Sequence, residues 1–193
     1  MIFLVLGLVI FFGTHLFSAY RSREPGKDIR AKMGQGPYMG LYSLVSIAGF
    51  ALIVWGYGAA RPAPILYMPP VWFAHINLVL MLFAMVFLVA AYMPTGHIKK
   101  AVKHPMLLAV KIWAAGHLLA NGELNSVLLF GSFLAYGVLD RIAVKKRGDN
   151  GPGPDVKANV MGDVGAVVVG LGAYAAIAHW LHPILFGVPA VPG

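Results

Sequence analysis

The sequence predicts an all-α protein: a membrane-embedded bundle of six transmembrane helices that forms a single domain over residues 1–193. Two observations predict this class. Hydrophobic residues make up 59% of the chain and charged residues only 11%, whereas soluble domains are roughly 45–50% apolar. In addition, apolar stretches of about 20 residues, the length that crosses a bilayer, recur along the whole chain. That distribution favours one helical bundle over a soluble domain with an anchor.

Six apolar stretches are expected to form the spans. In chain order they are Met1–Tyr20, Tyr38–Tyr57, Pro70–Tyr92, Pro105–Asn121, Leu124–Val144 and Met161–His182. The segments between them are polar or rich in glycine and proline, which disfavours a continuous helix. The fourth stretch is short and contains Lys111. The short turn after it carries a glycine suited to a helix C-terminus, so the fourth and fifth spans are predicted to form an antiparallel hairpin.

The distribution of basic residues predicts the orientation. All but two of the 15 lysine and arginine residues lie at or after the ends of the first, third and fifth stretches. They are Arg21, Arg23, Lys27, Arg30, Lys32, Lys99, Lys100, Lys103, Arg141, Lys145, Lys146, Arg147 and Lys157. Short basic loops stay in the cytoplasm, so both termini are expected on the outer side of the membrane. Topology and contact with membrane lipid account for these clusters, and nucleic acid is not expected as a partner. The first span has no basic segment before it and is expected to stay uncleaved.

Histidine is the metal ligand that the composition leaves available. The chain has no cysteine, which excludes disulfides, iron–sulfur clusters and thiolate-ligated haem. His15, His75 and His117 each have apolar neighbours on both sides. An ionisable side chain inside a membrane is costly unless it faces the bundle interior and finds a partner. Three such histidines indicate a haem held by imidazole ligands. The alternative is that each ring is hydrogen-bonded to a neighbouring helix.

The depths of these histidines suggest which rings can pair. At a rise of 1.5 Å per residue, His75 and His117 lie about 8 Å and 6 Å below the outer surface, and His15 lies about 8 Å above the inner surface. Depth alone therefore pairs His75 with His117, and His15 with His104. His117 shares a helix stripe with Trp113 and Asn121, which are expected to wall and hydrogen-bond a porphyrin.

The remaining ionisable residues have simpler interpretations. His97, His104, His179 and His182 lie near the predicted ends of spans, where polar interface residues are ordinary. Lys111 is too deep to reach the interface easily and is expected to find an internal partner, with Asp140 and Asp163 as candidates. Asp163 is alternatively a helix cap. No catalytic motif of the soluble enzyme classes is present, so no catalytic residue is assigned.

Several motifs resemble the NnrU family of bacterial membrane proteins. The longest is KHPMLLAVKIWAAGHLLANGEL at 103–124, and the others are HLFSAYRSR, LYSLVSIAGFALIVWGY and HPILFGV. Together they cover nearly the whole chain. The family is associated with denitrification and nitric oxide reductase function, and is related to 15-cis-ζ-carotene isomerase, a haem b enzyme with histidine ligands. The resemblance implies a haem b site with His15 and His117 as ligands. At Tyr136 the isomerase has a further histidine, and this difference argues against isomerase activity more than against haem.

Three functions follow from these observations. The first is a haem b-binding accessory protein of nitric oxide and denitrification metabolism, in the bacterial inner membrane with periplasmic termini, with nitric oxide reductase or another respiratory protein as partner. The second is a haem-dependent cis–trans isomerase of a carotenoid or other isoprenoid polyene. The third is a cofactor-free membrane scaffold or assembly factor. A haem absorption band distinguishes the first two from the third.

Overall fold

The computed structural model describes residues 1–191, and its regular structure in this range is helical. The long helices are α1 (Ile2–Tyr20), α3 (Gln35–Ala59), α4 (Trp72–Tyr92), α6 (Pro105–Ala120), α7 (Leu124–Lys146) and α8 (Val160–Ala176). The short ones are α2 (Ile29–Met33), α5 (His97–Val102), the π-helix η1 (Ile177–Leu181) and α9 (His182–Phe186). The predicted all-α class is confirmed.

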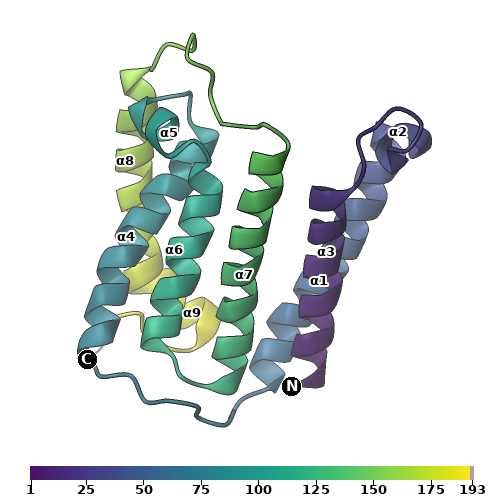
Figure 1. Ribbon diagram of the computed structural model, residues 1–193. Coiled ribbons are helices and arrows are strands. Elements are labelled where there is room, and N and C mark those ends of the chain that lie inside the picture. Colours follow the sequence, from purple (N-terminus) through teal and green to yellow (C-terminus); the bar gives the residue numbers. More distant parts are fainter. Residues whose placement is uncertain (192–193) are drawn as a thin grey trace.

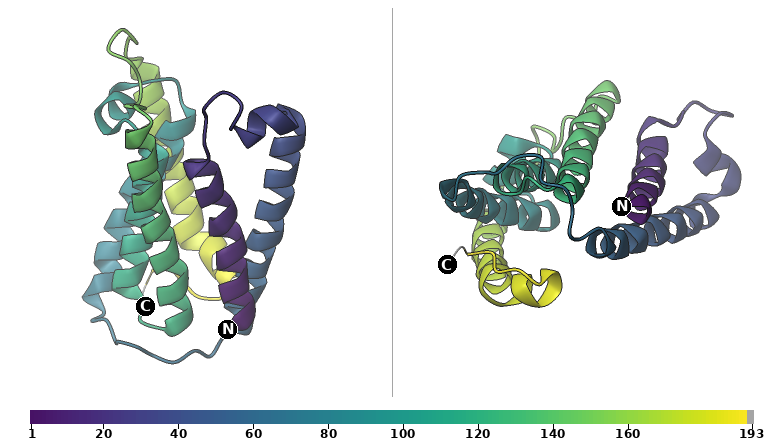
Figure 2. Two further views of the ribbon diagram at one scale, coloured as in Figure 1. Left: turned by 45° about the vertical axis from the view of Figure 1, so that its right-hand side comes forward. Right: turned by 90° about the horizontal axis from the view of Figure 1, so that it is seen from below.

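The long helices form one group and one pair that meet at α7. Helix α4 packs against both α6 and α8, and α1 packs against α3. Helix α7 contacts α6 on one side and α1 on the other, so it joins the group to the pair. Figure 1 shows α7 standing between them, and the view from below in Figure 2 shows that the helices run roughly alongside one another. The site described below is built along α7, on the sides where it meets α6 and α1.

Five helical segments are long and apolar enough to cross a membrane: Ile2–Tyr20, Gln35–Ala59, Trp72–Tyr92, Leu124–Lys146 and Val160–Phe186. The protein is therefore a membrane protein by the length and composition of its helices. Helix α6 has 16 residues, which is about 24 Å of helix, against a hydrocarbon core of about 30 Å. Six long helices form where six spans were predicted, but the number of spans that the structure supports is five.

Local sequence explains where several helices begin and end. Pro105 occupies the first turn of α6, where its missing N–H has no intrahelical partner. Only three residues separate α6 from α7, and the two helices pack together, which confirms the predicted hairpin. The last span was predicted to end at His182, but helical structure continues to Phe186 through the π-helix η1. Pro183 follows η1 and lacks an N–H for the preceding turn, which accounts for the local widening.

Glycines bring α1 and α3 into backbone contact. A Cβ atom added at Gly7 would lie 2.6 Å from the backbone nitrogen of Ile53, and one at Gly49 would lie 2.8 Å from that of Phe11. Both distances are far below van der Waals contact, so only glycine permits this spacing. Close packing through small residues is a common way to associate helices in lipid, where no hydrophobic force drives them together.

The two ends of the bundle differ in charge. The connections after α1, α4 and α7, which carry the short helices α2 and α5, lie at the upper end in Figure 1. These connections hold most of the basic residues. The N-terminus and α9 lie toward the lower end, as does the α3–α4 connection with Arg61. Basic charge is thus concentrated at one end of the bundle.

Candidate functional site

His117 lies in the last turn of α6 and has one ring nitrogen committed to the backbone. Its Nδ1 lies 2.8 Å from the carbonyl oxygen of Trp113, one turn earlier. A carbonyl only accepts hydrogen bonds, so Nδ1 carries the proton and Nε2 of the neutral ring is left with a free lone pair. The ring stacks on Phe130 of α7, with centroids 4.6 Å apart and an interplanar angle of 26°. The imidazole is therefore oriented by both a hydrogen bond and a stacked ring.

His15 in α1 has the same arrangement. Its Nδ1 donates to the carbonyl oxygen of Phe11 at 2.7 Å, which again leaves Nε2 free. The ring lies 5.3 Å from that of Tyr42 in α3 and 5.7 Å from that of Tyr136 in α7, measured between centroids. The Tyr136 hydroxyl donates to Asp140 at 3.3 Å. His15 thus faces the junction of three helices.

Aromatic side chains connect the two histidines through a series of ring contacts. The ring of Phe11 lies 4.1 Å from His15 and 6.0 Å from Phe133 of α7. Phe133 in turn meets Trp113 edge-on at 5.1 Å, and Trp113 lies 5.3 Å from His117. His15 and His117 therefore belong to one aromatic cluster, with three rings between them along this path.

The two helical neighbours singled out beside His117 both touch it. Trp113 supplies the carbonyl that orients the imidazole. Asn121 follows the end of α6, and its side-chain amide donates to the carbonyl oxygen of His117 at 2.9 Å. The same carbonyl also accepts a bond from the backbone nitrogen of Asn121 at 2.9 Å, so Asn121 is bonded twice to the last turn of α6. Asn121 thus holds the backbone at His117, and its amide nitrogen is already engaged.

The α3–α4 connection closes the end of the bundle where His117 lies. The Tyr67 hydroxyl donates to the carbonyl oxygens of Leu118 and Asn121, the latter at 2.9 Å. The backbone nitrogen of Leu66 donates to the carbonyl oxygen of Gly122 at 2.8 Å. Desolvation raises the pKa of Tyr67, which keeps the phenol protonated as the donor that these bonds need. The proline-rich connection is thereby fixed against the α6–α7 turn.

His75 is placed differently from the other two histidines. On α4, Asn77 faces α6, because a Cβ atom added at Gly116 would collide with its side-chain oxygen. His75 comes two residues earlier, which is about 200° around the helix, and its side chain is exposed. It therefore points away from α6, although His75 and His117 are close in predicted depth.

His104 and Asp163 make hydrogen bonds near the basic end. His104 Nε2 donates to the carbonyl oxygen of Asp149 at 3.2 Å. Asp163 accepts three hydrogen bonds from the start of α5: 2.8 Å from the His97 amide, 2.8 Å from its ring and 2.9 Å from the Ile98 amide. Within residues 1–191 no ion pair includes Lys111. The expected pairing of Lys111 with Asp140 or Asp163 is therefore wrong.

The donor chemistry at His15 and at His117 fits a haem axial ligand. A haem iron takes only one or two ligands from the protein, so a larger cluster is not needed, and residues 1–191 contain no group of three or more metal-ligating side chains. Histidines that bind metals usually donate their other N–H to a carbonyl or carboxylate. Both histidines have that bond and keep Nε2 free.

A family model describes nearly this whole chain. The model of the NnrU protein matches residues 3–190. The chain belongs to the NnrU family. The match confirms the resemblance drawn from the motifs, and it includes every helix of the bundle. Comparisons with curated proteins and with solved structures gave no match.

In this NnrU protein several members of the site were not predicted. Phe130 and Phe133 of α7, which contact His117 and Trp113, are ordinary apolar residues in the sequence. Tyr42, which lies beside His15, is likewise one of eight tyrosines. The available signal was their spacing: Phe130 and Phe133 are three residues apart and share a helix face. The sequence around these two residues does not show which helix that face meets.

Proposed function

We propose that this NnrU protein is a haem b-binding integral membrane protein, accessory to nitric oxide and denitrification metabolism in the bacterial inner membrane. The observation that carries the proposal is the matched geometry of His15 and His117. Each ring donates Nδ1–H to the carbonyl four residues earlier and leaves Nε2 free within one aromatic cluster. The role in nitrogen-oxide metabolism, with nitric oxide reductase or another respiratory protein as partner, rests on the family resemblance.

His117 is the ligand that we propose as the anchor. The Trp113 carbonyl and the Phe130 ring both hold the His117 imidazole, so Nε2 is oriented before haem binds. His15 is proposed as the opposite ligand in place of His75, since His75 points away from α6. One iron can take both imidazoles only if the rings of Phe11, Phe133 and Trp113 move aside. Haem b, when bound, would supply an iron that takes a diatomic ligand such as nitric oxide in exchange for one of the two imidazoles.

We further propose six spans with both termini in the periplasm. Helix α6 is short, but a bilayer adapts to a short span by local thinning at modest cost. The connections after α1, α4 and α7 share one end of the bundle and hold most of the basic residues (Figure 1), as a cytoplasmic face requires. A phosphatase or fluorescent tag after Gly193 tests the orientation. Cytoplasmic reporter activity there would overturn it.

Absorption spectroscopy of the purified protein tests haem binding. We expect a Soret band and a pyridine haemochrome spectrum of haem b. His117→Ala should remove the haem, because an axial imidazole contributes a bond to iron. His104→Ala should keep most of it, because that ring lies at the far end of α6 and bonds to Asp149. An unchanged haem content and Soret maximum in His117→Ala would refute the assignment.

A second pair of variants identifies the opposite ligand. His15→Ala should convert a six-coordinate low-spin spectrum into a five-coordinate high-spin one, whereas His75→Ala should leave the spectrum unchanged. The reverse result would assign His75 in place of His15. If the unmodified protein is already five-coordinate and His15→Ala leaves it so, His117 is the sole ligand and the proposed pair is wrong.

The physiological role is tested in membranes. Membranes from cells that express the protein should consume nitric oxide faster than membranes from cells expressing His117→Ala at the same level. Equal rates would remove the support for a haem-dependent role in nitric oxide metabolism. If purified protein has no Soret band at all, the cofactor-free scaffold becomes the better hypothesis.

The isomerase is a second candidate because of the family's relation to that enzyme, and one contact argues against it. Tyr136, at the position where the related isomerase has a further histidine, lies directly beside His15. The difference between the two proteins therefore falls next to a proposed ligand. Co-expression with a poly-cis carotene, followed by chromatography of the pigments, distinguishes this activity. We expect no isomerisation by the unmodified protein, and isomerised product that disappears in His15→Ala would favour the isomerase.

A further inference from the structure

A basic cleft of about 230 Å³ lies between the C-terminal ends of α1 and α7. Its charged lining residues are Arg21, Arg23, Lys146 and Arg147. Among the described residues that line it there is no carboxylate. The cleft sits at the end of the bundle where the basic connections gather.

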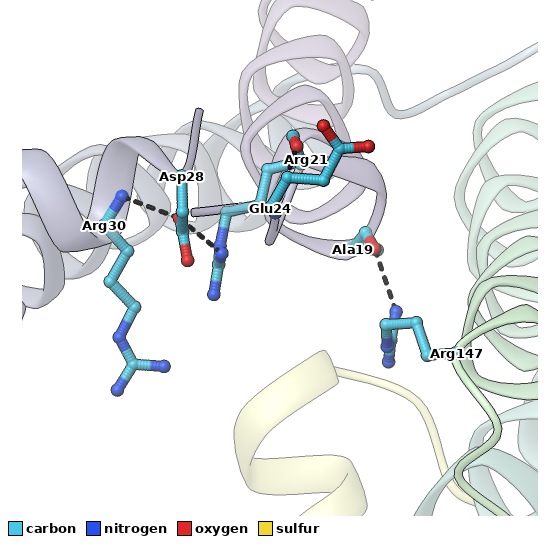
Figure 3. Close-up of polar contacts among 7 residues, drawn as sticks. Ala19, Arg21, Glu24, Asp28, Arg30 and Arg147 are labelled. Atoms are coloured by element: carbon cyan, nitrogen blue, oxygen red, sulfur yellow. Dashed lines mark hydrogen bonds and ion pairs between the residues drawn. The ribbon is translucent and has the colours of Figure 1, made fainter. Parts of the chain in front are cut away.

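The cations of this cleft are only partly neutralised. Arg21 Nη1 pairs with Asp28 at 2.6 Å, and the Arg21 side chain is only 7% exposed. Its Nε is buried with no hydrogen-bond partner among residues 1–191. Arg147 Nη1 donates to the carbonyl oxygen of Ala19 at 2.8 Å, which ties the two helix ends together (Figure 3). In the described part of the chain, Arg23, Lys146 and Arg147 make no ion pair.

The charges in the cleft repel one another. Partial burial and the nearby guanidinium groups of Arg147 and Arg21 lower the pKa of Arg23 below its ordinary value. The direction of this change means that the positive form is disfavoured at that position. A bound anion would relieve the repulsion.

A second, largely apolar cleft of about 330 Å³ continues along the same two helices toward the membrane interior. Its lining includes Leu8, Phe12 and Leu16 of α1 and Leu139 of α7. Tyr20 lies between the two clefts: it lines the basic cleft, and its hydroxyl donates at 2.8 Å to the carbonyl oxygen of Leu139, which lines the apolar cleft.

The lining residues recur every three or four positions, so both clefts lie on one face of each helix. On α1 that face carries residues 9, 13, 16 and 20, and on α7 residues 132, 136, 139, 143 and 146. Gly13 opens the apolar part, because a Cβ atom added there would meet nothing within 4 Å. The two clefts together are called the α1–α7 seam. From Arg21 to Leu8 this seam is about 20 Å long.

We propose that the α1–α7 seam binds one anionic phospholipid, with its phosphate among Arg23, Lys146 and Arg147 and an acyl chain along the apolar cleft. The basic cleft supplies charge complementarity to a phosphate. The apolar cleft that continues from it selects a lipid over free phosphate, because phosphate alone would leave that surface unused. The basic cleft shares no residue with the aromatic cluster of His15 and His117, whereas the apolar cleft is also lined by Tyr136, which lies beside His15. Binding of the lipid does not require the proposed haem.

Native mass spectrometry of the full chain in detergent tests the proposal, with phosphatidylglycerol as the probe and phosphatidylcholine as the uncharged comparison. We expect one tightly retained phosphatidylglycerol. Since a basic residue near a membrane surface contributes about 1 kcal/mol of attraction, Arg23→Gln with Lys146→Gln should weaken retention about 30-fold. The matched control, Lys32→Gln with Lys157→Gln, removes two charges from the same end but outside the cleft, and should change retention less than about twofold.

A variant of the apolar half separates lipid from free phosphate. Gly13→Phe fills the open cleft without a backbone collision. It should therefore weaken the binding of phosphatidylglycerol and leave the binding of inorganic phosphate unchanged. If inorganic phosphate displaces the lipid at equal concentration, or if Gly13→Phe has no effect, the acyl part of the proposal is wrong. Equal retention of the two lipids, or full retention in the Arg23→Gln and Lys146→Gln variant, would overturn the headgroup part. Gly13→Phe and the comparison of the two lipids test the proposal even if the Arg23→Gln and Lys146→Gln variant does not fold.

Discussion

Replacing Gly7 by alanine should push α1 away from α3, whereas the same change at Gly13 of the same helix should not. A Cβ atom at Gly7 would meet three backbone atoms of α3 between 2.6 and 2.9 Å away. Backbone atoms cannot rotate aside as a flexible side chain can. At Gly13 nothing lies within 4 Å of the added atom, so this position is a matched control in the same membrane environment.

The expected magnitude follows from the distance that the helices must separate. Ordinary contact begins at 3.4 Å, so the Gly7 variant must open the interface by about 0.8 Å, and a gap of that size loses a quarter to a half of each dispersion contact along it. Overpacking of this kind costs about 1–3 kcal/mol. Gly13→Ala should instead be neutral or stabilise by up to about 1 kcal/mol, because alanine favours a helix over glycine.

Unfolding of the two purified variants in mixed micelles, titrated with a denaturing detergent and followed by circular dichroism, measures this difference. We expect Gly7→Ala to be less stable than Gly13→Ala by at least about 1 kcal/mol, roughly a fivefold change in the unfolding equilibrium. If the two variants unfold at the same detergent fraction, the close backbone contact between α1 and α3 does not exist.

Three further predictions concern single polar contacts. Although desolvation opposes the change, hydrogen bonds lower the pKa of Asp28 in the folded protein. The stability that this carboxylate contributes should be complete above about pH 4 and lost as pH falls through the folded pKa. The unfolding temperature of Asp28→Asn should therefore vary less with acid than that of the unmodified protein. Asp163→Ala should lower stability, because it leaves the start of α5 unbonded, and hydrogen exchange at the Ile98 amide should be faster; unchanged exchange would contradict the contact. Tyr57→Phe removes the 2.9 Å bond to the buried Ser126 hydroxyl and should lower stability by about 1 kcal/mol, measured against Tyr92→Phe at an exposed tyrosine; equal effects would refute it.

Much of the fold is predictable because hydropathy and chain-breaking residues act locally. The six long helices lie where apolar stretches were found, and Pro105 and the Asn121–Leu124 turn set their limits around α6. The length of α6 was harder to interpret, since an apolar stretch does not show whether its 16 helical residues cross the bilayer. The short helix α5 was not anticipated. It is held by Asp163, which is 66 residues from His97.

The contacts of His117 were likewise predictable only where they are local in the chain. Its contacts with Trp113 and Asn121 are four residues apart in the chain, so helical periodicity alone places them together. The expected partner for Lys111 could not be predicted in this way, because Asp163 is captured by backbone amides of another helix. Depth arithmetic likewise compared His75 with His117 along the membrane normal, but it carried no information on which way His75 points around α4.

The sequence by itself therefore determined the class of protein, the positions of the helices, the concentration of basic residues at one end and the family. These properties depend on residues adjacent in the chain or one helical turn apart. Only the tertiary structure decided that α7 stands between α6 and α1, which places Phe130 and Phe133 against Trp113 and His117 and Tyr136 against His15. The physical reason is that every long helix here is apolar on most of its surface, so the faces that meet are selected by side-chain shape and glycine contacts between distant segments.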